Sequence, residues 1–530
     1  MNSDPRGAEI LVKTLQQAGV EKIFTLSGNH IMPVFDALRD SSIQLYHVRH
    51  EGAAVHMAEA YARLSGKLGV ALVTGGPGHA NAIGALYTAR QSETPLLLLS
   101  GHAALGELGK GAFQEMDQPA IAAPLTKAAW MVASPAHLAH DLARAISLAQ
   151  EGRPGPVHLS LPVDCLEQSL PYLEPLFSTP TITPLDGDAL GKLLGHLNNA
   201  VRPLIILPPA LCTVPGQTLA AALAAHNLPV IPMESPRGLN DPALGDVQSL
   251  FRRADLILLA GKLLDFTLKF GNASAARWIV IDPDSTALTR ARAGLGDKLA
   301  FSAQADIAPL LRQLAAAPLA ASPARTAWHA EAAAALARRP PPPAAPPEAL
   351  NSFTMCARLG AYVRTLQNPI FICDGGEIGQ WAQSLIQAPS RVINGVAGAI
   401  GSALPFALGA KAAAPHRPVL AVMGDGTFGF HMAEFETALR HNLPFVAIIG
   451  NDARWNAEYQ IQKRDFGPLR TFGCELLPGT RYDAAVAALG GHGELVTSAA
   501  EIEPALDRAF ASQQPACVNI LIDGLPAPKV

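Results

Sequence analysis

Short apolar runs alternate with amphipathic segments along most of this chain, and the clearest example lies near its C-terminal end. Val419–Met423 and Phe445–Ile449 are apolar runs of strand length. Between them Met432, Phe435 and Leu439 recur at three- and four-residue spacing, which predicts one buried face of a helix. A strand–helix–strand unit of this length predicts two parallel strands joined by a right-handed crossover.

The same unit recurs in the first hundred residues. There the apolar run Val70–Thr74 precedes a helical segment and a second apolar run. Gly75, Pro95 and Gly101 mark its boundaries at the same spacing as Gly424, Pro444 and Gly450. Two copies of one supersecondary unit predict two related sheets.

A third alternating region lies between these two copies, where apolar runs such as PLIILPP and WIVIDPD alternate with helical segments. We therefore predict an α/β fold with three doubly wound parallel-sheet domains. The predicted segments are an N-terminal domain at 1–175, a central domain at 185–315, an Ala/Pro-rich linker at 316–350 and a last domain at 351–530. Within the linker, Ala327–Ala337 is predicted to be helical.

Composition narrows the class of protein. The chain has 530 residues, 49% of them hydrophobic and 16% charged, with a formal net charge of −4. It has no dense basic run, which argues against a nucleic-acid partner, and no apolar stretch long enough to span a membrane. The N-terminus lacks the apolar core of a signal peptide. Six cysteines stand singly, which favours reduced thiols in a cytoplasmic enzyme.

Two acids mark the first candidate site. Asp425 follows one predicted strand within Gly424-Asp425-Gly426, and Asp452 follows the next strand. The carboxyl ends of adjacent parallel strands lie together, where α/β sheets bind ligands. Glycine-freed amides suit a phosphate, whereas two carboxylates would repel it. Because Mg²⁺ binds through one or two carboxylates plus ligand phosphates, the pattern predicts a magnesium–phosphate site.

This pattern, a GDG, a helix, a strand and then Asn451-Asp452, resembles the diphosphate signature of thiamine diphosphate enzymes. The resemblance implies that Mg²⁺ is held by Asp425, Asp452 and the backbone carbonyl of Arg454. Asp452 departs from the family, in which Asn is usual. The residues expected at the cofactor here are Gly424, Gly426 and Thr427, the turn Gly376-Glu377, Gly398 as a backbone acceptor for the aminopyrimidine, and Ile400 beneath the thiazolium ring.

The N-terminal region carries a second part of this resemblance. The segment RHE-x-x-A-x-H-M-A-E, followed by TGGPG and Asn81, is similar to the pyrimidine-binding half of the same family. The resemblance makes Glu51 the acid that hydrogen-bonds the aminopyrimidine, with Pro77 and Asn81 at the cofactor. Judged on residue type alone, Glu51 is also a favourable acid in the first turn of a helix.

His30 and Gln114 are the candidates on the substrate side. His30 follows a predicted strand, Lys22–Leu26, and precedes a helix; a role as an ordinary helix-start residue is an equal alternative. Gln114 lies in GAFQE, which is similar to a segment of acetolactate synthases. We expect both to act as proton donor or orienting group.

The resemblance implies a carbon–carbon lyase or carboligase acting on 2-keto acids or 2-hydroxyketones, similar to acetolactate synthase or benzaldehyde lyase. Glu458, at the position of an acid in pyruvate decarboxylases, keeps a 2-keto acid decarboxylase as an alternative. A flavin-linked oxidase would need FAD in the central domain, which some relatives fill with FAD or ADP. The sequence has no GxGxxG motif, which disfavours FAD in the central domain without excluding it. A non-catalytic cofactor-binding protein is a further alternative, against which the intact Glu51 argues. In the family that the chain resembles, two subunits form each active site together, and the resemblance therefore implies a homodimer or a homotetramer.

Overall fold

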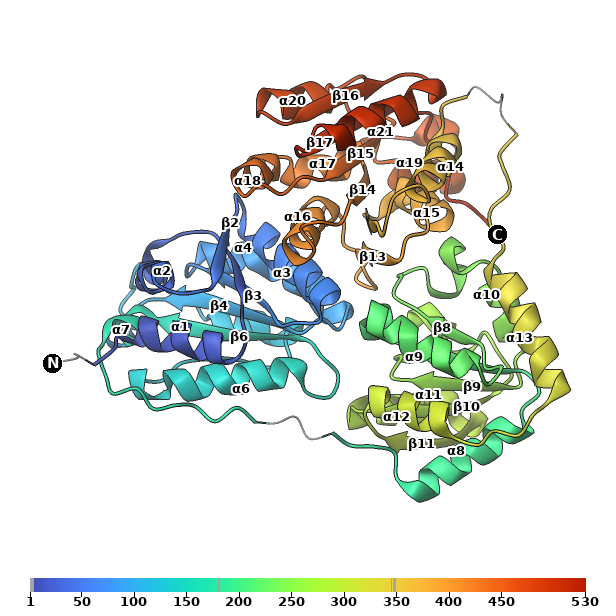
Figure 1. Cartoon of the computed structure of the whole chain (residues 1–530), viewed down its shortest axis with the longest axis horizontal. Helices are drawn as coiled ribbons and strands as arrows, with labels where there is room; N and C mark the ends of the chain where they lie inside the picture. Colours follow the sequence, from blue (N-terminus) through green and yellow to red (C-terminus); the bar gives the residue numbers. More distant parts are fainter. Residues whose placement is uncertain (1–3, 179–181, 345, 347–348) are drawn as a thin grey trace.

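The computed structural model describes residues 4–178, 182–344, 346 and 349–530. Figure 1 shows three lobes, each built on a sheet with helices packed on it. All paired strands in the three sheets run parallel. The predicted fold class, three parallel-sheet α/β domains, is therefore confirmed.

The N-terminal lobe contains a six-stranded sheet of order β2-β1-β3-β4-β6-β5. Its elements are α1 (Gly7–Gln17), β1 (Lys22–Thr25), α2 (Met32–Arg39), β2 (Gln44–His47), α3 (Glu51–Ser65), β3 (Gly69–Val73), α4 (Pro77–Gln91), β4 (Leu96–His102), α5 (Gln118–Ala122), β5 (Ala129–Met131), α6 (Leu138–Gln150), β6 (Pro156–Pro162) and α7 (Val163–Glu167).

The central lobe contains a five-stranded sheet of order β11-β10-β9-β7-β8. Its elements are α8 (Gly187–Asn199), β7 (Pro203–Leu207), α9 (Val214–Ala224), β8 (Val230–Pro232), α10 (Val247–Arg253), β9 (Leu256–Ala260), β10 (Arg277–Asp282), α11 (Ser285–Leu295), β11 (Leu299–Gln304), α12 (Ile307–Ala316) and α13 (Pro323–Leu336).

The C-terminal lobe contains a six-stranded sheet of order β13-β12-β14-β15-β17-β16. Its elements are α14 (Ser352–Val363), β12 (Ile370–Cys373), α15 (Gly376–Leu385), β13 (Ser390–Ile393), α16 (Ala403–Ala413), β14 (Val419–Gly424), α17 (Asp425–His431), α18 (Glu434–Arg440), β15 (Val446–Asn451), α19 (Asn456–Asp465), α20 (Tyr482–Ala488), β16 (His492–Val496), α21 (Ile502–Ala511) and β17 (Ala516–Leu521).

The two six-stranded sheets have the same strand order, counted from the first strand of each. The repeated unit corresponds to β3-α4-β4 in one sheet and β14-α17-α18-β15 in the other. The internal repeat predicted from glycine and proline spacing is confirmed. The second copy differs in detail because its helix begins at Asp425 itself and is interrupted at Met432 and Ala433.

The N-terminal and C-terminal lobes share one hydrophobic core through α3 and α16, which lie against each other (Figure 1). Both helices carry many alanines on the contact, and Gly409 brings the backbones close. A Cβ at Gly409 would lie 2.4 Å from the carbonyl oxygen of Met57. The close approach therefore requires glycine at this position.

The predicted linker at 316–350 contains helix α13, which extends the predicted helix Ala327–Ala337 at its N-terminal side. Trp328, Ala332 and Ala335 of α13 are buried in the core of the central sheet. Trp328 Nε1 also donates to the carbonyl of Pro203 at 2.9 Å. We therefore propose that the central domain extends to Leu336 and that the linker is shorter than expected. Residues 345, 347 and 348 of that linker lie outside the described residues.

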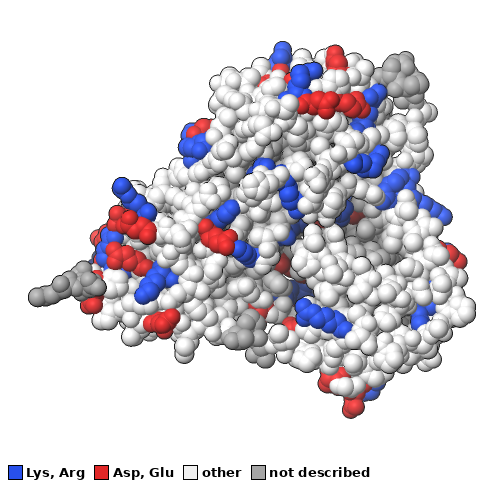
Figure 2. Space-filling view, viewed as in Figure 1, with Lys and Arg blue, Asp and Glu red and all other residues white. Residues whose placement is uncertain are grey.

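Among the described residues, no helix is both long and apolar enough to cross a membrane. The six cysteines are all free thiols, five of them buried. Figure 2 shows acidic and basic side chains intermixed on the face in view. The isolated cysteines and mixed charges follow the pattern expected from composition, while the cytoplasmic location stays a prediction.

Candidate functional site: two half-sites on related sheets

A hollow of about 190 Å³ opens at the carboxyl ends of β12, β14 and β15. The register of the sheet creates it, because Gly424 of β14 pairs with Gly450 of β15 and the two acids that follow emerge together. The lining residues are Arg237, the turn 375–378, Gly398, Ile400, the segment 424–427, Gly450, Asp452 and the segment 454–458. Every C-terminal residue predicted to bind cofactor or metal lines this hollow.

Asp425 and Asp452 are the two acids at its floor. Asp425 is 3% exposed, and its Oδ2 atom has no hydrogen-bond partner among the described residues. Burial raises the pKa of Asp425 to about 6. Burial and then the charge of Asp425 raise the pKa of Asp452 to about 7. A buried and a half-buried carboxylate whose pKa values are both raised fit a divalent cation between them, because the cation stabilises both ionised forms.

Two helix N-termini face the same hollow. α17 begins at Asp425, and α15 begins at Gly376. Gly376 has φ +74°, and a Cβ there would meet no atom within 4 Å. At Gly426 a Cβ would lie 2.7 Å from the Trp455 ring, so a side chain there would displace the indole. First-turn amides without intrahelical partners are suited to bind phosphate oxygens.

Thr427, Glu377 and Arg454 line the same hollow, and their side chains make different contacts. Thr427 Oγ1 donates to the carbonyl of Gly424 at 3.1 Å. Burial raises the pKa of Glu377, which accepts a 2.8 Å hydrogen bond from Gln380. The Arg454 guanidinium lies 4.5 Å from the centroid of the Tyr459 ring. The Arg454 side chain is therefore packed on Tyr459, and its charge still lowers the pKa of Asp452.

The loop before α16 forms another wall of the hollow. Gly398 has φ +64°, and a Cβ there would lie 3.6 Å from Pro236 of the central lobe. Ile400 is 39% exposed and its Cγ2 atom approaches Gly375. An apolar side chain projecting into an otherwise polar hollow supports a flat ring rather than a phosphate.

The N-terminal half-site is centred on Glu51, the first residue of α3. Glu51 is 8% exposed, and its Oε2 atom accepts a hydrogen bond from Asn81 Nδ2 at 3.0 Å. His50 caps the helix by accepting from the amide of Gly52. Pro77 and Asn81 stand exposed at the start of α4. Asn81 thus orients the acid and also reaches the surface.

His30 and Gln114 lie beside this acid-bearing surface. His30 Nδ1 is 3.3 Å from Thr74 Oγ1, and its ring stacks on Phe113 with centroids 6.2 Å apart. Burial lowers the pKa of His30, which keeps the imidazole neutral near pH 7. Gln114 has φ +58° and packs over Gly76, where a Cβ would lie 2.7 Å from that of Gln114.

Within one chain, the hollow is lined by residues of the central and C-terminal lobes. No N-terminal-lobe residue appears among the described residues that line the hollow. The structure thus brings Asp425, Asp452, Gly376, Gly398 and Ile400 together but leaves Glu51, His30, Gln114, Pro77 and Asn81 on a separate surface.

Sequence patterns missed two residues of these half-sites. Arg237, from the central lobe, lines the C-terminal hollow. Gln118 is fully buried under the N-terminal half-site, where it accepts from the amide of Gly76 at 2.9 Å and donates to Ser160 at 2.9 Å. Neither stands in a motif, and only the packing of distant segments identifies them.

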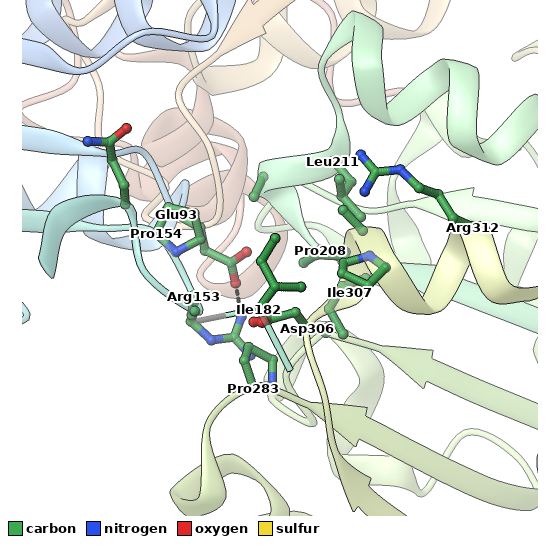
Figure 3. Close-up of a pocket in the computed structure, with 16 residues that line it drawn as sticks. Glu93, Arg153, Pro154, Ile182, Pro208, Leu211, Pro283, Asp306, Ile307 and Arg312 are labelled. Atoms are coloured by element: carbon green, nitrogen blue, oxygen red, sulfur yellow. Dashed lines mark hydrogen bonds and ion pairs between the residues drawn. The ribbon is translucent and has the colours of Figure 1, made fainter. Parts of the chain in front are cut away.

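A larger cavity of about 410 Å³ lies between the N-terminal and central lobes (Figure 3). Glu93, Arg153, Pro208, Leu211 and Arg312 are among its lining residues. Arg153 is held there by ion pairs to Glu93 and, at 2.5 Å, to Asp282. Its lining is mostly apolar and its central arginine is already paired, so it differs in chemistry from the acid-rich hollow.

Two family models match this chain in the two lobes that carry the half-sites. "Thiamine pyrophosphate enzyme, N-terminal TPP binding domain" matches residues 5–121, and "Thiamine pyrophosphate enzyme, C-terminal TPP binding domain" matches residues 374–520. Thiamine pyrophosphate is another name for thiamine diphosphate. The chain belongs to the thiamine pyrophosphate enzyme family, and the resemblance first drawn from motifs is confirmed.

Full-length relatives agree with this assignment. The acetolactate synthase large subunit IlvG of Mycobacterium tuberculosis is 33% identical over 97% of this chain and 95% of its own length. The 2-hydroxyacyl-CoA lyase 2 of Caenorhabditis elegans is 30% identical over 98% of this chain and 90% of its own. The human 2-hydroxyacyl-CoA lyase 2 is 31% identical over 97% of this chain and 90% of its own length.

Proposed function

We propose that this enzyme is a thiamine diphosphate- and Mg²⁺-dependent carbon–carbon lyase or carboligase acting on 2-keto acids or 2-hydroxyketones. The observation that carries the proposal is the hollow in which two helix N-termini lie beside a pair of acids, the buried Asp425 and the half-buried Asp452. The names of the full-length relatives, acetolactate synthase and 2-hydroxyacyl-CoA lyase, favour bond formation or cleavage beside a carbonyl.

The residues of the hollow fit this cofactor. Asp425, Asp452 and the carbonyl of Arg454 would hold Mg²⁺, and the unpartnered Oδ2 of Asp425 supports a cation there. Gly376, Glu377, Gly424, Gly426 and Thr427 would surround the diphosphate, while Gly398 and Ile400 would contact the rings. When bound, thiamine diphosphate supplies an electron sink for the electrons of the broken carbon–carbon bond.

The N-terminal half-site would handle protons. Glu51, held by Asn81, would exchange a proton with the aminopyrimidine ring. His30, kept neutral by burial, and Gln114 would face the substrate, where a neutral imidazole can donate or accept a proton.

A second copy of the chain would complete each site, so we propose a homodimer or a homotetramer. Its support is the separation of the two half-sites within one chain. Large apolar side chains also stand exposed beside each half: Phe113 at 66% near His30, and Phe466, Leu469 and Phe472 at 64%, 99% and 86% after α19. Exposed apolar surface of this kind marks an interface between proteins.

Two narrower alternatives differ in support. Glu458 lines the hollow, and an acid beside the reacting centre keeps the decarboxylase alternative. A flavin-linked oxidase has less support. The loop after β7, at the switch point of the central sheet, begins Pro208-Pro209, and proline has no N–H to offer a dinucleotide phosphate.

The test is a substrate screen on the purified protein with thiamine diphosphate and Mg²⁺ added or withheld. Pyruvate, acetoin, benzoin and a 2-hydroxyacyl-CoA cover the proposed substrate classes, and gas chromatography and mass spectrometry identify the products. We expect turnover of at least one of them that needs both the cofactor and the metal. Turnover of none, despite cofactor binding, would refute the lyase and carboligase proposal.

A further inference from the structure

A polar cavity of about 260 Å³ adjoins the cofactor hollow, between the central and C-terminal lobes. Arg237, Gly375, Gly376 and Gly398 line both spaces, so the cavity opens onto the expected position of the cofactor rings. Its remaining lining is Ser235, Pro236, Gln380, Gln383 and Asn394.

Three amide side chains line this cavity, and each donates a hydrogen bond from its NH₂ group to a protein oxygen. Gln380 donates to Glu377 at 2.8 Å, Gln383 to the carbonyl of Asp374 at 3.3 Å, and Asn394 to the carbonyl of Ala399 at 2.7 Å. With their NH₂ groups directed to protein oxygens, the amide oxygens are left for a ligand. The cavity therefore offers acceptors for hydroxyl groups.

Arg237 is the cation positioned to bind an anion at this junction. The hollow contains four acids, namely Asp425, Asp452, Glu377 and Glu458, and two arginines. Arg454 stacks on Tyr459, whereas no hydrogen bond or ion pair of the Arg237 guanidinium is found among the described residues. An exposed guanidinium in a concave site suits bidentate binding of a carboxylate.

The backbone around Arg237 is fixed, which distinguishes it from a freely moving surface side chain. Its amide donates to Ser235 Oγ at 3.2 Å, and its carbonyl accepts from Asn240 at 2.9 Å. Gly238 has φ +52°, and a Cβ there would lie 2.1 Å from the carbonyl oxygen of Thr267. The turn that presents Arg237 therefore has one conformation.

A buried ion cluster anchors this turn to all three lobes. Glu234, immediately before the turn, is fully buried. It accepts from Arg63 of α3 at 2.7 Å and from Arg391 of β13 at 2.7 Å. One acid of the central lobe thus ties the N-terminal and C-terminal lobes to the segment that carries Arg237.

We propose that Arg237 is a specificity-determining residue that binds the carboxylate of a small 2-keto or 2-hydroxy acid in this cavity. The proposal rests on the function proposed above and narrows its substrate class from neutral hydroxyketones to anions. Arg237 supplies the charge, and the amide oxygens of Gln380, Gln383 and Asn394 accept from hydroxyl groups of the substrate.

The test compares wild type, Arg237→Ala, Arg237→Lys and the matched control Arg252→Ala, an exposed arginine on α10. Calorimetry measures binding of methyl acetylphosphonate, an anionic analogue of pyruvate, to each protein loaded with thiamine diphosphate and Mg²⁺. Tryptophan fluorescence measures cofactor affinity separately. KM and kcat are determined for pyruvate and for diacetyl, which carries no carboxylate.

We expect Arg237→Ala to weaken phosphonate binding about tenfold or more, because a charge-assisted hydrogen-bond pair is lost. Arg237→Lys should recover part of this loss, and Arg252→Ala should match wild type. Cofactor affinity and the KM for diacetyl should stay unchanged in all variants.

Several outcomes would overturn the proposal. They are equal binding of the phosphonate by Arg237→Ala, no phosphonate binding by cofactor-loaded wild type, and a matching loss for diacetyl. Weaker cofactor binding in Arg237→Ala would assign the arginine to the diphosphate instead. Competition by inorganic phosphate or coenzyme A, but not by pyruvate, would assign it to a phosphate. A wild type that binds no thiamine diphosphate would refute the underlying function as well.

Discussion

At the scale of single residues, the two half-sites use carboxylates in opposite ways. Asp425 and Asp452 stand together; burial raises the pKa of both, and the charge of Asp425 raises the pKa of Asp452 further, which suits them to a cation. Glu51 accepts one amide hydrogen bond, at Oε2, which leaves its second oxygen for another partner. We propose that the same functional group serves for metal binding in one half and for proton exchange in the other.

Replacing Glu51 by Gln tests the proton-exchange role. The amide keeps the shape of the side chain and the contact with Asn81 but cannot take up the proton. We expect Glu51→Gln to bind thiamine diphosphate normally and to slow hydrogen–deuterium exchange at C2 of the cofactor by roughly 10²–10⁴-fold, the usual size of a general acid–base contribution. NMR of the quenched cofactor measures the rate, with exposed Glu107→Gln as control. An unchanged rate would exclude the role.

Substitutions of Asp452 test the metal site, because the family usually has Asn at this position. Either side chain supplies one oxygen to Mg²⁺, so Asp452→Asn should be mild. Asp452→Ala removes the oxygen, and we expect it to weaken Mg²⁺ and thiamine diphosphate together by about 10–100-fold.

Titration of each ligand in the presence of the other measures both affinities, and exposed Asp465→Ala is the control. Wild-type affinity for Mg²⁺ in Asp452→Ala would show that Asp452 is not a ligand.

At the scale of elements, local chain order explains what the sequence could predict. The strand ends at Gly424 and Gly450 and the repeat that contains them depend on short connections, so spacing alone predicted that Asp425 and Asp452 meet. The spacing of Met432, Phe435 and Leu439 predicted one helix face and marked only part of the helical segment, which begins at Asp425 as α17 and continues as α18. Met432 and Leu439 are half-buried, and only Phe435 is fully buried.

The same reasoning could not predict contacts between segments that lie far apart in the sequence. Arg237 reaches the hollow because the turn after β8 packs on the loop before α16, some 160 positions further along the chain. Gln118 lies under Gly76 because of the path of the loop before α5. α13 looked like part of a linker since its alanines show little periodicity, although Trp328 buries it on the central sheet.

The Glu234 cluster gives a prediction at this scale. Glu234→Ala would remove the acid that Arg63, which is 8% exposed, shares with Arg391, and would leave Arg63 only its longer 3.5 Å ion pair with Glu59. Removing one partner of a buried ion pair costs about 3–5 kcal/mol. We therefore expect an earlier unfolding transition in urea.

Glu503→Ala, which breaks the more exposed pair with Arg358, is the matched control and should change the transition little. A Glu234→Ala midpoint equal to wild type would show that the cluster does not hold the lobes together.

At the scale of the whole molecule, each chain carries halves of two different sites. The N-terminal half-site and the C-terminal hollow belong to lobes that share a core through α3 and α16, and the hollow is lined by residues of the central and C-terminal lobes. If two copies complete each other's sites, inactive variants of opposite halves should restore activity when mixed.

Glu51→Gln and Asp425→Ala provide this test. Each homodimer has no intact site, whereas a mixed dimer has one intact and one doubly altered site. With random exchange of subunits in a symmetric dimer, we expect about a quarter of wild-type activity after co-refolding an equal mixture. Mixing Glu51→Gln with His30→Ala, both in the same half, is the control and should stay inactive. No recovery in the first mixture would place the complete site within one chain.

The core shared by α3 and α16 also sets the order in which the chain can fold as it is made. The ribosome releases α3 (Glu51–Ser65) long before α16 (Ala403–Ala413) exists. Because synthesis proceeds at roughly 5–20 residues per second, the alanine-rich face of α3 remains without α16 for tens of seconds. During synthesis the N-terminal lobe therefore exposes an apolar surface that chaperones can bind, and its burial is completed only when the last third of the chain emerges.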